Sequence, residues 1–149
     1  MIYFVEEDTA QNNAFFLELE CRGHQVSIIA NADKAFQELS GIRDSDADLV
    51  ILDVMLAVES EGHTRFERKA TSNYIETGLV LLDDLIMCNP AVFPQKAVFF
   101  TNASSIGLVK KIESKAKQHG ISLFRKADFD NPFDFADKIE GIIRSQKSK

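Results

Sequence analysis

Short apolar runs alternate with amphipathic segments along most of the chain. The apolar runs are rich in Val, Ile, Leu and Phe, which is typical of buried strands, and they cover residues 2–5, 25–30, 49–54, 97–101 and 121–126. The segments between them carry apolar residues near helical spacing and cover residues 11–22, 31–39, 79–88, 104–119 and 131–143. This alternation predicts an α/β fold, a three-layer sandwich in which helices flank a five-stranded parallel sheet through right-handed crossovers.

Capping residues indicate where several helices begin and end. Either Asn31 or Asp33 can cap the second predicted helix through its side-chain oxygen. Asn131 followed by Pro132 predicts the start of the last helix, because proline suits the first helical position. Gly120 closes the helix before the fifth strand.

The stretch 57–77 breaks the alternation, because it is polar and charged and lacks helical periodicity. Gly78, which opens the third helix, follows Asp53 by 25 residues (78 − 53), whereas such loops usually contain about 2–6 residues. We interpret 57–77 as an inserted loop. Two interpretations stay open: either the loop is flexible and solvated, or it has a role of its own, in that it folds over the sheet edge at Asp53 or selects a partner.

Composition limits the domain organisation and the classes of partner. A chain of 149 residues with 45% hydrophobic content suits one domain, here 1–146, followed by a polar tail at 147–149. The net charge of −6 disfavours nucleic acid. No apolar stretch approaches the roughly 18 residues of a membrane span, and the chain does not start like a signal peptide. We therefore expect a cytoplasmic protein without direct membrane or nucleic-acid binding.

Two cysteines, Cys21 and Cys88, lie in separate predicted helices and have no CxxC spacing. This spacing favours reduced, packed thiols over a disulfide or a zinc site.

Carboxylates follow two of the predicted strands. Asp53 ends the most apolar run, while Glu6, Glu7 and Asp8 follow the first strand. Ligands of parallel sheets bind beyond the carboxyl ends of the strands, so we expect these side chains to meet at one edge. Two carboxylates about 4 Å apart repel each other by roughly 4 kcal/mol at an effective dielectric constant of ~20. The site therefore needs a cation or raised pKa values.

Thr101 and Lys126 end the fourth and fifth strands and should reach the same edge. Mg²⁺ prefers oxygen ligands, and an aspartate can attack phosphorus to form an aspartyl-phosphate. A lysine can contact phosphoryl oxygens as a point charge, and a threonine hydroxyl can donate a hydrogen bond to them. These residue types suit phosphoryl transfer.

Five motifs occur in order at the predicted strand ends and helix start: Val5-Glu6-Glu7-Asp8, Leu49-Val50-Ile51-Leu52-Asp53-Val54-Met55-Leu56, Gly78-Leu79-Val80-Leu81-Leu82, Phe99-Phe100-Thr101-Asn102 and Phe124-Arg125-Lys126. In this arrangement the chain resembles the receiver domains of bacterial response regulators, over nearly its whole length apart from the insertion. The resemblance implies the flavodoxin-like strand order 2-1-3-4-5.

The resemblance also implies functional roles. Asp53 would be the phosphoacceptor, and Thr101 and Lys126 would contact the phosphoryl group. Magnesium would be bound by Glu7, Asp53 and the backbone carbonyl of Met55, with Glu6 close by and Asp8 as a further candidate. The implied partners are a sensor histidine kinase or phosphotransfer protein and a downstream protein. A homodimer through the fourth helix, fifth strand and fifth helix stays open.

The chain departs from the family pattern at several positions. Glu7 stands where the family usually has an aspartate at the principal metal position. Ala127 follows the lysine in place of a proline that forms a cis peptide bond. Leu123 replaces the aromatic residue that often takes part in switching. The inserted loop 57–77 is the largest departure.

The leading interpretation is a receiver that accepts phosphate on Asp53 with Mg²⁺ and is not a dedicated enzyme, although it can assist its own phosphorylation and dephosphorylation. No output domain follows 1–146, so we expect signalling through protein contacts unless the chain is a fragment of a longer protein. One alternative is a pseudo-receiver, a protein-binding module in which Lys126 keeps an inactive site neutral. Another is a haloacid-dehalogenase-like phosphatase, which expects a second aspartate where this chain has Met55.

Overall fold

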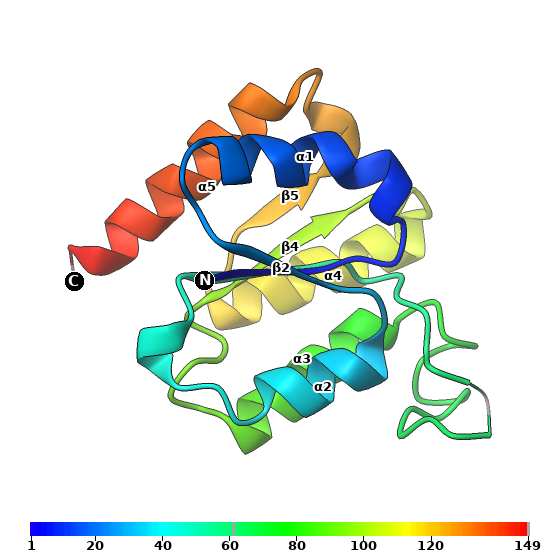
Figure 1. The fold of residues 1–149 in the computed structure, drawn as a ribbon. Helices are drawn as coiled ribbons and strands as arrows, with labels where there is room; N and C mark the ends of the chain where they lie inside the picture. The colour runs from blue at the N-terminus through cyan, green and yellow to red at the C-terminus, as the bar shows by residue number, and fades with distance from the viewer. Residues whose placement is uncertain (61, 149) are drawn as a thin grey trace.

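A five-stranded parallel sheet lies between two layers of helices in the computed structural model, which describes residues 1–60 and 62–148 (Figure 1). The strands are β1 (Ile2–Val5), β2 (Val26–Ile29), β3 (Leu49–Leu52), β4 (Ala97–Thr101) and β5 (Leu123–Arg125). The helices are α1 (Thr9–Cys21), α2 (Ala32–Leu39), α3 (Thr77–Cys88), α4 (Ile106–His119) and α5 (Pro132–Lys147), with short 3-10 turns at Asp44–Asp46 and Lys126–Asp128. The strand order β2-β1-β3-β4-β5 confirms the predicted α/β sandwich and its topology.

The register of the sheet brings the ends of β1 and β3 together. Val5 pairs with Ile29 on one side and with Leu52 on the other. Leu52 in turn pairs with Phe99 of β4. The residues that follow β1 and β3 therefore leave the sheet side by side at its carboxyl edge.

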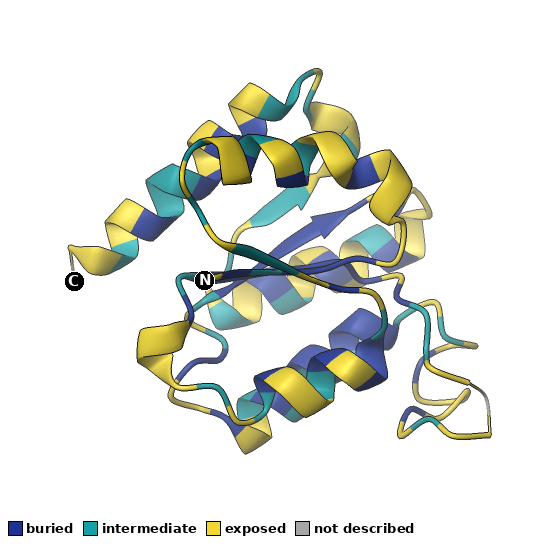
Figure 2. Cartoon of the chain, in the orientation of Figure 1, coloured by how far each residue is buried: buried dark blue, intermediate teal, exposed yellow. Residues whose placement is uncertain are grey.

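The two faces of the sheet bury different side chains. On the face covered by α1 and α5, phenylalanines dominate, and the rings of Phe100 and Phe135 stack with centroids 4.5 Å apart. On the face covered by α2, α3 and α4, the core is mainly aliphatic. All four residues of β3 are buried, as expected for a central strand covered on both sides. Figure 2 shows the neighbouring strand β4 buried in the same way.

Several boundaries are shorter or longer than the sequence predicts. β3 ends at Leu52 rather than at residue 54, because the Val54 carbonyl accepts a hydrogen bond from Gly78 N at 2.8 Å and the chain turns away from the sheet. β5 covers only Leu123–Arg125, and Lys126 opens a 3-10 turn. Helix α5 continues to Lys147, into the predicted polar tail.

The prediction of packed cysteines is wrong, because the thiols of Cys21 and Cys88 are both free and exposed. Each cysteine is the last residue of its helix. No helix among the described residues is long and apolar enough to cross a membrane.

The insertion is docked against α2 through Asp33. The buried Asp33 carboxylate accepts hydrogen bonds from Glu59 N at 2.8 Å, Arg65 N at 3.0 Å and the Thr64 hydroxyl at 2.8 and 2.9 Å. Asp33 is therefore an anchor for the insertion and not the cap of α2. That cap is Asn31, whose side chain accepts from the backbone N–H of Lys34.

Further contacts hold the insertion beside α2 and α3 (Figure 1). The guanidinium of Arg65 lies 3.5 Å from the centre of the Phe36 ring in α2 and 3.3 Å from the Asp84 carboxylate in α3. Phe66 and Thr71 are buried. The described residues of the insertion thus form a structured segment against two helices, which disfavours the interpretation of a free, solvated loop.

Candidate functional site

Lys126 forms ion pairs with two buried carboxylates at the carboxyl edge of the sheet. Its Nζ lies 2.5 Å from Oε2 of Glu6 and 3.0 Å from Oδ2 of Asp53. Glu6 is 1% exposed and Asp53 5% exposed. Buried charges are stable only when they are compensated. When both carboxyl groups are ionised, one ammonium faces two carboxylates, and the cluster carries excess negative charge.

Burial and the neighbouring charges shift the pKa values of Glu6 and Lys126. Burial raises the pKa of Glu6 to about 7, and the nearby charge of Asp53 adds to the increase, while Lys126 opposes it. Burial alone would lower the pKa of Lys126, but attraction to Asp53 and Glu6 outweighs it and raises that pKa. Near neutral pH the Glu6 carboxyl is therefore partly protonated, while Lys126 stays charged.

A close backbone contact fixes the loop that carries Asp53. The N–H of Asp53 donates to the carbonyl of Val5 at 3.1 Å, and Oδ1 of Asp53 accepts from Met55 N at 3.3 Å. A Cβ atom added to Gly78 would lie 2.3 Å from the Asp53 carbonyl oxygen and 2.6 Å from the Cα of Val54. Only glycine allows α3 to begin this close to the loop.

The acidic residues after β1 point in different directions. Glu6 turns inward and accepts from Asp8 N at 3.1 Å, while Asp8 caps α1 by accepting from Gln11 N at 3.1 Å. Glu7 is exposed. Burial of part of its side chain raises the pKa of Glu7, and the charge of Asp53 adds to this effect. The pKa of Glu7 therefore depends on the charge of Asp53, although Glu7 forms no ion pair among the described residues.

A cavity of about 160 Å³ collects most of the predicted site residues, and it is lined by Glu6, Glu7, Asp8, Gln11, Asn12, Asp53, Met55, Asn102 and Lys126. None of the described residues of 58–77 lines it. Thr101 is not part of the lining either. Thr101 is buried at the end of β4, and its Oγ1 accepts from Ala103 N at 3.2 Å.

Three polar lining residues were not predicted from the sequence: Gln11, Asn12 and Asn102. Gln11 and Asn12 lie in the first turn of α1, where polar side chains are common and give no signal of their own. Asn102 directly follows Thr101, and only its position after β4 could have marked it.

The family departures at β5 are visible in the structure. The peptide bond between Lys126 and Ala127 is trans, and the one cis bond among the described residues joins Phe93 and Pro94. Leu123 is half-buried in β5 and pairs with Phe99 of β4.

The donor atoms of the cavity fit Mg²⁺ chemically. The lining offers carboxylate and amide oxygens, which hard cations prefer, and the pKa values of Glu6 and Glu7 are raised by burial and then by the nearby charge of Asp53. Among residues 1–60 and 62–148, no three acidic, histidine or cysteine side chains are gathered closely enough to hold a metal ion by themselves. A cation here would therefore keep water ligands, as Mg²⁺ usually does.

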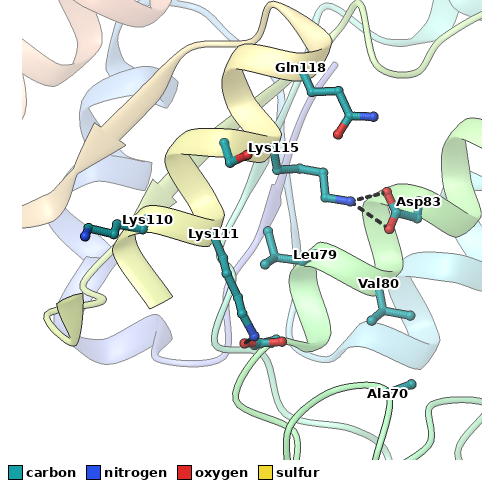
Figure 3. A pocket seen from close by; sticks show the side chains of 10 residues that line it. Ala70, Leu79, Val80, Asp83, Lys110, Lys111, Lys115 and Gln118 are labelled. Carbon is teal, nitrogen blue, oxygen red and sulfur yellow. Dashed lines mark hydrogen bonds and ion pairs between the residues drawn. The ribbon is translucent and has the colours of Figure 1, made fainter. Parts of the chain in front are cut away.

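A larger cavity of about 500 Å³ lies elsewhere, between α3, α4 and Ala70 of the insertion (Figure 3). Lys111 Nζ lies 2.6 Å from the Glu76 carboxylate, and Lys115 Nζ lies 2.9 Å from both carboxylate oxygens of Asp83. These two pairs span the groove and join its two sides. The acidic cavity, in contrast, holds the buried carboxylates of Glu6 and Asp53 with a single ammonium, which makes the smaller site the candidate for chemistry.

Comparison with solved structures identifies the fold. A CheY-like response regulator receiver domain protein from Methanospirillum hungatei JF-1 has a TM-score of 0.69 and 21% identity, and the match covers 99% of this chain and 95% of that one. The receiver domain of the Francisella response regulator 1452 has a TM-score of 0.66 and 10% identity, with 97% of each chain covered.

A third similar structure is a response regulator from Burkholderia pseudomallei with a phosphorylated aspartic acid, a calcium ion and citrate. Its TM-score is 0.57 at 16% identity, and the match covers 94% of this chain and 70% of that one. No family model and no curated protein matches the sequence.

Strand order, layers and similarity to these structures define the fold. The chain has the fold of response regulator receiver domains, with an insertion between β3 and α3.

Proposed function

We propose that this protein is a phosphoacceptor receiver that takes a phosphoryl group onto Asp53 in the presence of Mg²⁺. The observation that carries the proposal is the buried Asp53 carboxylate, held at the carboxyl edge of β3 with Lys126 Nζ 3.0 Å away and an acidic cavity in front of it. The Burkholderia response regulator of similar fold, which holds a phosphorylated aspartic acid and a calcium ion, supports the same chemistry.

The proposed reaction transfers phosphorus between two nucleophiles. A carboxylate oxygen of Asp53 attacks the phosphorus of a phosphohistidine donor, the new O–P bond forms as the P–N bond breaks, and the leaving imidazole takes up a proton. Lys126 stays beside the transferred group as its counter-ion. Thr101 has a hydroxyl proton that no described residue accepts, and we assign it a hydrogen bond to the phosphoryl oxygens.

The residues that would hold Mg²⁺ are Glu7, Asp53 and the backbone carbonyl of Met55, with Glu6 and Asp8 close by. When bound, the cation neutralises charge on the phosphoryl oxygens. Lys126 already neutralises part of the charge of Glu6 and Asp53, so Glu7 becomes the first carboxylate available for the cation.

The expected partners follow from the receiver-domain fold. A sensor histidine kinase or a phosphotransfer protein would supply the phosphoryl group, and a downstream protein would read the changed surface. The protein is proposed as a phosphoacceptor in a relay and not as a dedicated enzyme.

Intact-mass measurement after incubation with acetyl phosphate and Mg²⁺ tests the proposal. We expect a gain of one phosphoryl group that is absent when the metal is chelated and absent in Asp53→Asn. Lys126→Met serves as a second variant that keeps Asp53 and should slow the gain strongly. No gain in the wild-type protein at any magnesium concentration would contradict the proposal.

One observation favours a second candidate, a pseudo-receiver that binds a partner without phosphorylation. Lys126 pairs with both Glu6 and Asp53, which partly neutralises the site in the absence of a metal. Isothermal titration calorimetry with Mg²⁺ separates the two functions, because a pseudo-receiver of this kind would bind neither the cation nor the phosphoryl group.

A further inference from the structure

Asn12 is a buried amide in the wall of the acidic cavity. It is 4% exposed, and its Nδ2 donates to the carbonyl of Asp8 at 2.8 Å, which fixes the orientation of the side chain. No described residue donates to Oδ1 of Asn12, and this atom is not enclosed by the protein. The structure therefore leaves one amide oxygen available as an acceptor on the cavity side.

Other acceptors around the cavity are already in use. Oε2 of Glu6 is occupied by Lys126 and its Oε1 by Asp8 N, while the Asp8 carboxylate caps α1. A Mg²⁺ ion bound through one or two carboxylates keeps several water ligands, and each of these waters must donate its protons to an acceptor. Partners that orient such ligands commonly tune metal affinity by 10–100-fold.

We infer that Asn12 is a positioning residue for hydrated Mg²⁺. The Oδ1 atom of Asn12 would accept a hydrogen bond from a water bound to the cation, beside the first turn of α1. The inference rests on the proposed function, since it needs the cation at the acidic edge. It assigns a role to α1 that does not involve the phosphoryl group or the carboxylates directly.

Calorimetric titration with Mg²⁺ of two matched pairs of variants tests the inference. Asn12→Leu keeps the volume of the side chain and removes the acceptor, and we expect the Kd for Mg²⁺ to rise about tenfold. Asn13→Leu is the control, because Asn13 is the exposed neighbour and does not line the cavity. This control should bind Mg²⁺ like the wild-type protein.

The second pair separates a metal role from a purely structural one. Asn12→Asp loses the Nδ2 donor but keeps the acceptor, so a metal role predicts Mg²⁺ binding at least as tight as in Asn13→Asp, which carries the same added charge. A structural role of the amide predicts weaker binding in Asn12→Asp than in Asn13→Asp. This pair also decides the question if Asn12→Leu does not fold.

The outcomes distinguish the two proposals. If the wild-type protein binds Mg²⁺ and either Asn12→Leu matches Asn13→Leu or Asn12→Asp binds more weakly than Asn13→Asp, the role of Asn12 is overturned while the proposed function stands. If the wild-type protein binds no Mg²⁺, the proposed function fails and the role of Asn12 fails with it.

Discussion

Gly78 and Asp53 approach each other so closely that a single added methyl group would lie 2.3 Å from the Asp53 carbonyl oxygen. The contact joins the start of α3 to the loop that presents the Asp53 carboxylate. Any side chain at position 78 must push this loop away from its hydrogen bond with β1.

We expect Gly78→Ala to lower the free energy of unfolding by about 1–3 kcal/mol, the usual cost of overpacking, and to reduce phosphorylation by displacing Asp53. Urea unfolding and intact mass measure the two effects. Gly141→Ala in α5 is the matched control: nothing lies within 4 Å of its Cβ position. It should stabilise the helix by about 0.5–1 kcal/mol. Equal stability of both variants would show that the contact with Asp53 is not restrictive.

Removing the ammonium of Lys126 should destabilise the protein in a pH-dependent way. The pKa of Glu6 in the folded protein is raised to about 7. The contribution of the protonated Glu6 carboxyl to the stability of the fold is therefore complete at low pH and is lost as the pH rises through that value. Lys126→Met should therefore cost about 3–5 kcal/mol at pH 8 and clearly less at pH 5.5, as measured by urea unfolding. The control is Lys110→Met, since Lys110 is exposed and forms no ion pair among the described residues. A loss that does not change with pH would contradict the assigned charge states.

Asp33→Ala should release the insertion from α2. The carboxylate accepts hydrogen bonds from two backbone N–H groups and from the Thr64 hydroxyl. Each hydrogen bond to a charged group contributes about 1.5–3 kcal/mol to stability. We expect faster tryptic cleavage after Arg65, read by mass spectrometry under native conditions. Asp46→Ala, which affects only an exposed pair with Arg43, should leave cleavage unchanged. Unchanged cleavage in Asp33→Ala would show that other contacts hold the segment.

Arg22 joins the end of α1 to α5, with its guanidinium 2.7 Å from Asp137 and 2.6 Å from Glu140. Hydrogen bonds from Arg22 and His24 lower the pKa of Glu140. A lowered folded-state pKa gives stability that is present above the ordinary carboxylate range and lost as the pH falls through the folded value. Arg22→Gln should therefore melt below the wild-type temperature at pH 7 but not at pH 3, by circular dichroism. The same difference at both pH values would exclude this electrostatic origin.

The sheet was predictable from the sequence because each strand is short, apolar and buried. The run at 49–52 reads as a strand covered on both faces, and its register with β1 places Glu6 beside Asp53 once the topology is known. The exact strand ends were not predictable, since hydrogen bonds such as Gly78 N to the Val54 carbonyl are made between residues distant in sequence.

Sequence patterns could not predict how the insertion docks or which residues form the cavity wall. Asp33 contacts Thr64 across 31 positions, and neither residue belongs to a periodic pattern that could indicate the pairing. Asn12 is one of several polar residues in the first turns of α1, and only the fold distinguishes it from its exposed neighbour Asn13. Residue type suggests a chemistry for the carboxylates, but it does not show which of them points inward.

The helix pair α1–α5 and the helix pair α3–α4 are held together by different kinds of contact. Helices α1 and α5 share a phenylalanine core, in which Phe15 lies 5.0 Å from Phe135, and any sliding between them would open a void in close-packed rings. Across the groove, α3 and α4 are instead joined by the long side chains of Lys111 and Lys115, in ion pairs worth about 0.2–1 kcal/mol each. Raised salt should therefore increase the amplitude of α4 motion against α3 while leaving the α1–α5 side rigid.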